Sequence, residues 1–430
     1  MSAKTGFNLA TDAMLPQRDL LLDVDQVRRR FSARLGTEGA IEIDRCERLR
    51  VKYSPGASLR VLHRVEVGGA SYIVAARAFI GGRGKSAFGR AASKVISCGH
   101  LLPVAHDEEL DTVYWTFPND RKITNLSALA SPPEALANLL ERRWTRSRIV
   151  AYAPEKCVTA ECLGNKNELL AYAKIYADDE TGSYDIYNAL SKNISAAKSD
   201  LRIARALAYS EEHRALLLEP VAGRRLADLG DKERVNGFRR FGAALAALHG
   251  LPLSDDLPPF TRLDRNRLQD AARVIARARP DLAMLAENLA RELCKRRDGL
   301  ADQSVCLHGD VHPKNGILQN DRMALIDLDQ AGMGPAAADL GSLLAALRYL
   351  RCVGNITHAT GRELAAAFLC GYGDARRLPE ENSLRWHTAA ALLAERSLRA
   401  VNRIRGEGLR HLKELLLDSR RLLTEDGYEN

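Results

Sequence analysis

Two groups of alternating apolar and polar residues stand out in the first half of the chain. Three short alternating runs lie between residues 47 and 79, separated by Pro55-Gly56 and by a Gly-Gly pair at 68–69. Three more lie between residues 148 and 176, with a turn at Pro154 and a Gly-Asn pair at 164–165. Alternation with period two, interrupted by turn residues, is typical of antiparallel strands. The pattern therefore predicts two separate sets of strands.

The two sets of strands share a design. In each, the first strand ends in a Tyr-x-Pro segment, at residues 53–55 and 152–154, and the third strand carries a basic residue. The basic residue is Arg77 in the first set and Lys174 in the second, at nearly the same distance from the proline. We interpret the first set as a degenerate copy of the second, so that Arg77 corresponds to Lys174.

Apolar residues at offsets of three and four predict helices in most of the remaining chain. Before these helices, an apolar strand at 216–218 runs into Glu219-Pro220-Val221, as expected for a hinge between two lobes. The predicted class is α+β, with a cap-like N-terminal domain over residues 1–144, a small β-rich lobe over 145–219 and a large helical lobe over 220–430. Helical spacing occurs at residues 23–35, 235–248, 264–300 and 336–351 and again from 386 to 423.

Composition excludes several classes of protein. The chain of 430 residues is 46% apolar and 27% charged, which is ordinary for a soluble protein. It has no apolar run of membrane-spanning length and no signal-peptide profile at its start, so we expect a cytoplasmic protein without a membrane partner. The eight cysteines include no Cys-x-x-Cys pair, which favours neither a disulfide framework nor a zinc site.

The net charge of +8 raises the question of a nucleic-acid partner. The basic residues are spread along helical faces beside acidic ones, and they form no long basic tract interleaved with aromatic residues. We therefore expect no nucleic-acid partner. The remaining positive charge is compatible with an anionic nucleotide and with an anionic or neutral small molecule.

The candidate chemistry lies in residues 305–329. Asp310 is followed five residues later by Asn315, and Asp327 comes twelve residues after that. The intervening apolar runs, 317–318 and 323–326, are separated by Asn-Asp, a pair that tolerates positive φ and favours a hairpin. Asn315 and Asp327 are therefore expected to face each other. A base for an acceptor hydroxyl, with an amide and a carboxylate that hold magnesium, is what phosphoryl transfer requires.

These residues also carry a family resemblance. The segment reads His-Gly-Asp-x-His-x-x-Asn at 308–315, then Ile-Asp-x-Asp at 326–329 and Asp-Leu-Gly at 339–341. It resembles the aminoglycoside phosphotransferase and choline kinase superfamily, over about two thirds of the chain. The resemblance implies a bilobal protein-kinase-like fold, with the N-terminal domain as an addition.

The resemblance also implies roles for single residues. Asp310 would be the catalytic base, Asn315 and Asp327 the magnesium ligands, and His308 and Asp339 the residues that brace the catalytic loop.

The nucleotide would be ATP, bound with Mg²⁺. Lys174 would contact its phosphates, and the backbone at Glu219 and Val221 would receive the adenine. A family small lobe would carry a glutamate on the helix after the third strand, but here only Asp185 is available. Arg77, in the degenerate copy, is expected to contribute nothing to nucleotide binding.

The predicted function is ATP-dependent transfer of a phosphoryl group to a hydroxyl of a small molecule, with a sugar-like acceptor favoured. An aminoglycoside is polycationic and would require an acidic pocket, whereas the large-lobe helices are rich in arginine. Three alternatives stay open: a pseudokinase acting as a binding or scaffolding protein, an aminoglycoside kinase, and a protein kinase. The segment Arg83-Gly-Lys-Ser86 lacks the earlier glycine of a Walker motif, and we expect it to be a flexible basic loop.

Overall fold

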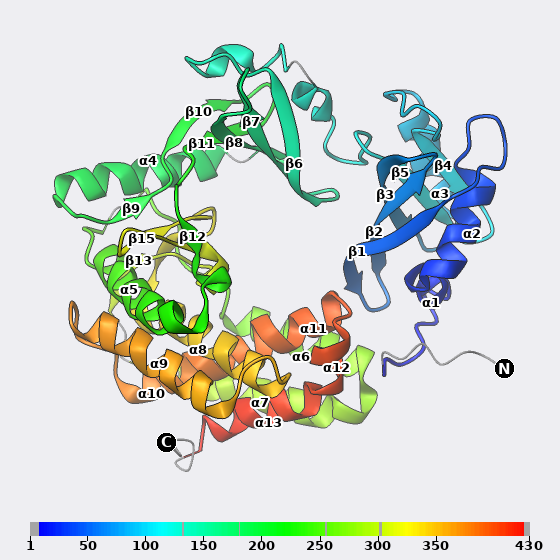
Figure 1. Ribbon diagram of the computed structural model, residues 1–430. Coiled ribbons are helices and arrows are strands. Elements are labelled where there is room, and N and C mark those ends of the chain that lie inside the picture. The colour runs from blue at the N-terminus through cyan, green and yellow to red at the C-terminus, as the bar shows by residue number, and fades with distance from the viewer. Residues whose placement is uncertain (1–7, 131–132, 180, 254–255, 301–302, 425–430) are drawn as a thin grey trace. The chain divides into compact units, whose positions relative to one another are not determined.

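The computed structural model describes the chain except residues 1–7, 131–132, 180, 254–255, 301–302 and 425–430. It divides into two compact units, which we call the β unit and the helical unit (Figure 1). The α+β class is confirmed. The β unit comprises Met1–Glu180, Leu207–Leu218 and Val401–Ile404, and the helical unit comprises Thr181–Ala206, Glu219–Ala400 and Arg405–Asn430.

The first sheet of the β unit contains the first predicted set of strands. Its strands pair antiparallel in the order β1-β2-β3-β5-β4. The buried Phe31 packs edge-on against Tyr114, with ring centroids 5.0 Å apart, so the predicted N-terminal helix contacts the sheet. The elements are α1 (Arg18–Leu22), α2 (Val24–Arg34), β1 (Arg45–Ser54), β2 (Ser58–Val67), β3 (Ala70–Ala78), α3 (Arg83–Ala92), β4 (Val104–Asp107) and β5 (Thr112–Thr116).

The second sheet of the β unit contains the second predicted set. Its order is β10-β11-β8-β7-β6. Buried side chains of both sheets, among them Leu62, Ala75, Trp144 and Val158, belong to one hydrophobic core. The strands are β6 (Arg146–Ala153), β7 (Cys157–Leu163), β8 (Leu169–Tyr176), β10 (Ala206–Ser210) and β11 (Ala215–Leu218), and α4 (Thr181–Ala196) follows β8 in the chain.

The two sheets have the same connectivity. In each, three antiparallel strands are followed by a helix and by two more strands of the sheet; the second of these pairs with the third strand, and the first pairs with the second. The register also agrees, because Arg77 pairs with Arg60 and Val113, while Lys174 occupies the same place opposite Thr159 and Leu216. The interpretation of the first sheet as a degenerate copy of the second stays a prediction.

The expectation of a flexible basic loop at residues 83–86 was wrong. These residues form the first turn of α3. The Asp111 carboxylate accepts hydrogen bonds from the backbone N–H groups of Gly82 (2.9 Å) and Gly84 (2.7 Å), which satisfies donors that a helix start leaves unpaired. The buried Ala87 then packs α3 against the sheet. The cap comes from a residue distant in sequence, so the local pattern did not reveal it.

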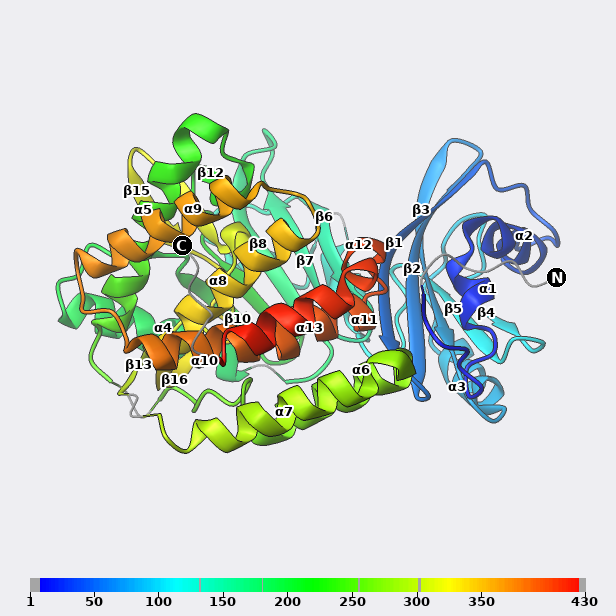
Figure 2. The same cartoon turned by 90° about the horizontal axis from the view of Figure 1, so that it is seen from below.

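The helical unit contains the predicted helices of the second half of the chain. Figure 2 shows α6, α7 and α13 side by side. Among the described residues, no helix is both long and apolar enough to cross a membrane. The helices are α5 (Asp231–His249), α6 (Arg265–Ala278), α7 (Ala283–Arg297), α8 (Ala336–Cys352), α9 (His358–Gly373), α10 (Glu381–Ala391), a π-helical segment (Leu392–Ser397), α11 (Leu398–Asn402), α12 (Gly406–Arg410) and α13 (Leu412–Arg421).

Short strands complete the helical unit: β9 (Arg202–Ile203), β12 (Arg224–Arg225), β13 (Ser304–Leu307), β14 (Gly316–Gln319), β15 (Arg322–Leu325) and β16 (Gly332–Pro335). They form a four-stranded sheet, β12-β14-β15-β9, and a separate pair, β13-β16. Short 3₁₀ turns lie at Leu126–Leu129, Ala137–Leu139, Leu226–Asp228, Pro280–Leu282 and Pro313–Asn315.

Two glycines bring α5 and α9 into close contact. A Cβ atom on Gly242 would lie 2.0 Å from the carbonyl oxygen of Phe368, and one on Gly371 would lie 1.9 Å from that of Arg239. No larger residue fits at either position without moving a helix. The close packing fixes the carboxyl end of α5, where His249 lies.

Candidate active site

The predicted hairpin places two candidate residues together. Strands β14 and β15 pair from Gly316–Leu325 to Gln319–Arg322, and the turn residues Asn320 and Asp321 have φ values of 47° and 63°. At the other end of the hairpin, the backbone oxygen of Asn315 accepts a hydrogen bond from Ile326 N–H (3.0 Å). Asn315 and Asp327 therefore flank the base of the hairpin, as the spacing predicted.

Asp339 holds the loop that precedes Asp310. This buried residue lies in the first turn of α8, and its carboxylate accepts hydrogen bonds from the N–H groups of His308 (2.7 Å) and Gly309 (3.0 Å). His249, the last residue of α5, is buried with its Nε2 3.1 Å from Asp339 and its Nδ1 3.0 Å from the Tyr372 hydroxyl. The loop at 308–309 and the end of α5, both distant in sequence from α8, thus converge on one carboxylate.

His308 connects this loop to the hairpin. Its Nδ1 accepts a hydrogen bond from Asp310 N–H (3.4 Å), and its Nε2 donates to the carbonyl oxygen of Ile326 (3.1 Å). Gly309, between them, has φ 76°, and a Cβ atom there would lie 1.8 Å from the carbonyl oxygen of Gln330. Only glycine fits this position. The backbone that carries Asp310 is therefore held from both sides.

Two arginines surround the carboxylate of Asp310. Arg262 Nη1 and Arg399 Nη2 lie 3.1 Å and 3.2 Å from the same oxygen, Oδ1. Burial alone would raise the pKa of Asp310, but the two guanidinium groups outweigh it and hold that pKa well below its usual range. The side chain of Asp310 keeps 29% of its surface exposed, that of Arg262 keeps 24% and that of Arg399 keeps 27%. The site thus presents an ionised carboxylate flanked by positive charge.

Arg262 is held in turn by a buried network. It donates a hydrogen bond to the carbonyl oxygen of Gly309 and lies 3.8 Å from Glu395. Glu395 accepts a hydrogen bond from the Ser342 hydroxyl (2.7 Å), and Arg396 donates to the Ser342 carbonyl oxygen (2.9 Å). Burial lowers the pKa of Arg396 to about 10, partly offset by Glu395. No motif in the sequence singled out Arg262, and Arg399 was one of many arginines in the C-terminal helices.

The base of the hairpin fits a magnesium ion bound together with a nucleotide. The Asn315 side-chain nitrogen donates to the carbonyl oxygen of Asp310 (2.9 Å), which leaves the amide oxygen as the side chain's possible ligand atom. Magnesium in kinases uses one or two such oxygens, from residues like Asn315 and Asp327, together with phosphate oxygens. The described residues contain no cluster of three or more His, Cys, Asp or Glu side chains that could hold a metal by themselves.

Tyr187 of α4 anchors the segment after Asp327. Its hydroxyl donates to the Asp329 carboxylate (3.3 Å) and accepts from Leu328 N–H (3.0 Å), and its ring is fully buried. Asp185, the only carboxylate expected on this helix, is exposed. The sequence analysis missed Tyr187 because a buried tyrosine in an apolar helix face carries no signal beyond packing.

The residues predicted to bind the nucleotide belong to different units. Lys174 is in β8 of the β unit. Glu219 and Val221 follow β11 and belong to the helical unit, where Glu219 donates its N–H to Arg205 O (2.9 Å). The hydrogen bond and charge of Arg205 lower the pKa of the Glu219 carboxyl. The roles assigned to these residues and to Asp310 remain predictions.

The sequence model of the phosphotransferase enzyme family, APH, matches residues 173–414, which is more than half of the chain. The chain belongs to this family, as the resemblance in residues 305–341 predicted. It is a phosphotransferase of the small-molecule kinase class, with an alcohol group as acceptor. The match begins next to Lys174, so it includes neither the first sheet nor β6 and β7. No curated protein matches the chain.

Solved structures that match this chain include the ternary complex of APH(2″)-IIa with streptomycin and ATP, at 14% sequence identity. The match covers 67% of this chain and 96% of that one, with a TM-score of 0.46. Spectinomycin phosphotransferase APH(9)-Ia, in complex with ADP and spectinomycin, matches at 12% identity over 67% and 96% of the chains with a TM-score of 0.46. A choline/ethanolamine kinase family protein from Mesorhizobium loti matches at 14% identity over 65% and 90%, with a TM-score of 0.43.

Proposed function

We propose that this enzyme transfers the γ-phosphoryl group of ATP, in the presence of Mg²⁺, to a hydroxyl of a sugar or similar small metabolite in the cytoplasm. One observation carries the proposal: Asp310, Asn315 and Asp327 converge at one hairpin, on a loop held by Asp339. Phosphoryl transfer needs a base and metal ligands close together, which supports our assignment of these roles to the three residues.

In the proposed reaction, Asp310 orients the acceptor hydroxyl and accepts its proton. Asn315 and Asp327 would hold Mg²⁺, which neutralises phosphate charge when bound. Lys174 steadies the nucleotide, and backbone groups at Glu219 and Val221 receive the adenine. Phosphoryl transfer has a loose transition state, so positioning and charge neutralisation supply most of the acceleration.

The charges around Asp310 favour a neutral or anionic acceptor. A polycationic acceptor would approach Arg262 and Arg399, both partly exposed, against electrostatic repulsion. A sugar can donate hydroxyl hydrogen bonds to Asp310, and a carboxylate or phosphate on the acceptor could pair with a guanidinium. An aminoglycoside acceptor is therefore the less favoured alternative.

The decisive experiment measures ADP release from Mg-ATP with the purified protein. The acceptor panel contains neutral sugars, sugar acids, sugar phosphates, an aminoglycoside and a peptide with Ser and Thr. We expect turnover above the acceptor-free rate with a neutral or anionic sugar. Nucleotide binding without turnover on any acceptor would favour the pseudokinase alternative, which the exposed Asp185 on α4 keeps open.

Lys174→Met should raise the KM for ATP and lower turnover, each by about tenfold or more, because the phosphates require a point charge that methionine lacks. Steady-state kinetics at fixed magnesium and salt measure both constants. Lys166→Met, in the exposed turn after β7, is a matched control and should leave both constants unchanged. An unchanged Lys174 variant would place the phosphate contact elsewhere.

Arg399→Met should raise the KM for the acceptor by about tenfold and leave the KM for ATP within a few fold. The substitution removes one of the two positive charges at Asp310, where the acceptor hydroxyl is proposed to bind. Arg410→Met removes an exposed charge paired with Glu407 and serves as the control. Equal acceptor constants in the Arg399 variant and the parent would contradict a role in acceptor binding.

A further inference from the structure

A row of basic residues crosses the first sheet of the β unit. Lys52 of β1 pairs with Arg60 of β2, and Arg60 pairs with Arg77 of β3. The corresponding row of the second sheet contains Ala151, Thr159 and Lys174. Three cations therefore lie side by side in the first sheet, where the second has one.

The carboxylate of Glu155, from the second sheet, binds two of these basic residues, Arg60 and Arg77. Glu155, in the turn between β6 and β7, accepts hydrogen bonds from Arg60 (3.0 Å) and Arg77, and it forms two with Arg121, both 2.8 Å. Its side chain keeps only 5% of its surface exposed. Burial would raise the pKa of Glu155, but the hydrogen bonds and charges of Arg121, Arg60 and Arg77 lower it. One buried carboxylate thus joins three cations of the preceding domain.

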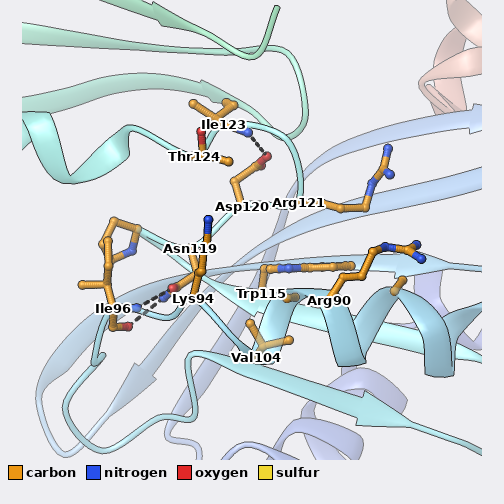
Figure 3. Close-up of a pocket in the computed structure, with 13 residues that line it drawn as sticks. Arg90, Lys94, Ile96, Val104, Trp115, Asn119, Asp120, Arg121, Ile123 and Thr124 are labelled. Carbon is orange, nitrogen blue, oxygen red and sulfur yellow. Dashed lines mark hydrogen bonds between the residues drawn. The ribbon is translucent and has the colours of Figure 1, made fainter. Parts of the chain in front are cut away.

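The same turn is held through its backbone. Asp120 Oδ2 accepts hydrogen bonds from Glu155 N–H (2.9 Å) and from the Tyr152 hydroxyl (2.6 Å). Asp120 Oδ1 accepts from Ile123 N–H (2.8 Å), which orders the segment that carries Arg121 (Figure 3). The carbonyl oxygen of Pro154 accepts from Arg60 (3.0 Å). Both the side chain and the main chain of the turn are therefore fixed from outside.

The turn has a conformation that its own residues disfavour. Glu155 has φ 61°, in the left-handed region where residues with a Cβ atom are strained by about 1 to 2 kcal/mol. The turn Ala153-Pro154-Glu155-Lys156 contains no glycine. Within the turn, the hydrogen bond from Lys156 N–H to Ala153 O (3.0 Å) opposes this strain. The contacts of Glu155 and Pro154 with residues of the first sheet and the segment after it add to that hydrogen bond.

This turn lies close to the residue proposed to bind the nucleotide phosphates. Lys174 pairs with Thr159, which lies three residues after Lys156 at the end of the turn, a distance of about 10 Å along the strand. In protein kinases a loop beside this lysine covers the phosphates and is glycine-rich. The exposed Lys156, at the end of the turn, adds a second charge in the same region.

We propose that the first sheet binds Glu155 in order to hold the β6–β7 turn in its nucleotide-binding conformation. Glu155, Arg77 and Arg121 are then positioning residues for ATP, although none of them contacts it. This inference rests on the proposed function, because it assumes that the second sheet binds ATP. It also assigns Arg77 a role that the sequence analysis did not expect, since Arg77 acts on the turn rather than on phosphate.

Glu155→Gln tests the inference, because the amide keeps the shape of the side chain and loses its charge. We expect the Kd for Mg-ATP to rise about tenfold, turnover at saturating ATP to stay within about twofold, and amide exchange in residues 153–158 to accelerate. Glu161→Gln, on β7, removes a carboxylate paired with the exposed Arg148 and should leave all three measurements unchanged.

Arg77→Met tests the same inference by removing one partner of Glu155 on the first sheet. Arg60 and Arg121 still bind Glu155 in this variant, so it can be measured even if Glu155→Gln does not fold. The Kd for Mg-ATP should again rise severalfold, and the double variant should show less than the product of the two single effects. Parent-like affinity in both single variants overturns this inference alone. A parent protein that binds no Mg-ATP overturns the proposed function and this inference together.

Discussion

Asp310→Ala is expected to lower turnover by about two orders of magnitude or more and to leave the affinity for Mg-ATP nearly intact. The expected loss is the usual scale for removing a general base. Asp310 is ionised because Arg262 and Arg399 hold its pKa well below the usual range, so the parent carries the base form at neutral pH. ATP affinity should persist because the proposed metal ligands and Lys174 are unchanged. Initial rates and calorimetric titration with Mg-ATP measure the two quantities.

Loss of Asp310 also leaves two arginines without their shared partner, so a second variant is needed. Asp310→Asn keeps the shape of the side chain and should lose turnover to a similar extent. Asp374→Asn, which removes the carboxylate of an exposed ion pair with Arg239, is the control and should retain turnover. Turnover near the parent value in both Asp310 variants would exclude Asp310 as the base.

Asp327→Asn is expected to abolish magnesium-dependent binding of ATP. Of the two proposed ligands, Asn315 is a neutral amide and Asp327 is a carboxylate, so Asp327 supplies the charge of this pair. Magnesium requires hard oxygen ligands and loses most of its attraction to the site when that charge is removed. In titrations with and without magnesium, the parent should show a large difference in ATP affinity and the variant almost none.

The opposite end of the same hairpin offers a matched control for this experiment. Asp321 lies in the turn and pairs with Arg240 at the surface, so Asp321→Asn should bind Mg-ATP like the parent. Tight binding of Mg-ATP by the Asp327 variant would show that Asp327 is not a metal ligand. Together the two replacements separate binding from chemistry, because Asp310 variants should bind ATP without turnover and Asp327 variants should not bind it.

The sequence by itself determined the local part of the site. Asn315 and Asp327 are joined by a short hairpin whose strands alternate and whose turn residues tolerate positive φ, so their proximity follows from local rules. The first three strands of each sheet, β11 and many of the helices were predictable for the same reason, since hydrophobic periodicity is a local signal. Strands β4, β5 and β10 and helix α3 were not predicted. The motifs at 308–315, 326–329 and 339–341 predicted the phosphotransferase family, which the family model confirms.

Only the tertiary structure decided what surrounds those residues. The two arginines at Asp310 lie 48 and 89 residues away in the chain. The carboxylate that starts α3 and the arginines that hold Glu155 are likewise distant in sequence from their partners. Such contacts depend on how helices and sheets pack, and an arginine that binds the Asp310 carboxylate looks the same in the sequence as one at the surface. Charge and spacing along the chain therefore predict the reacting groups, whereas packing selects the residues that tune and position them.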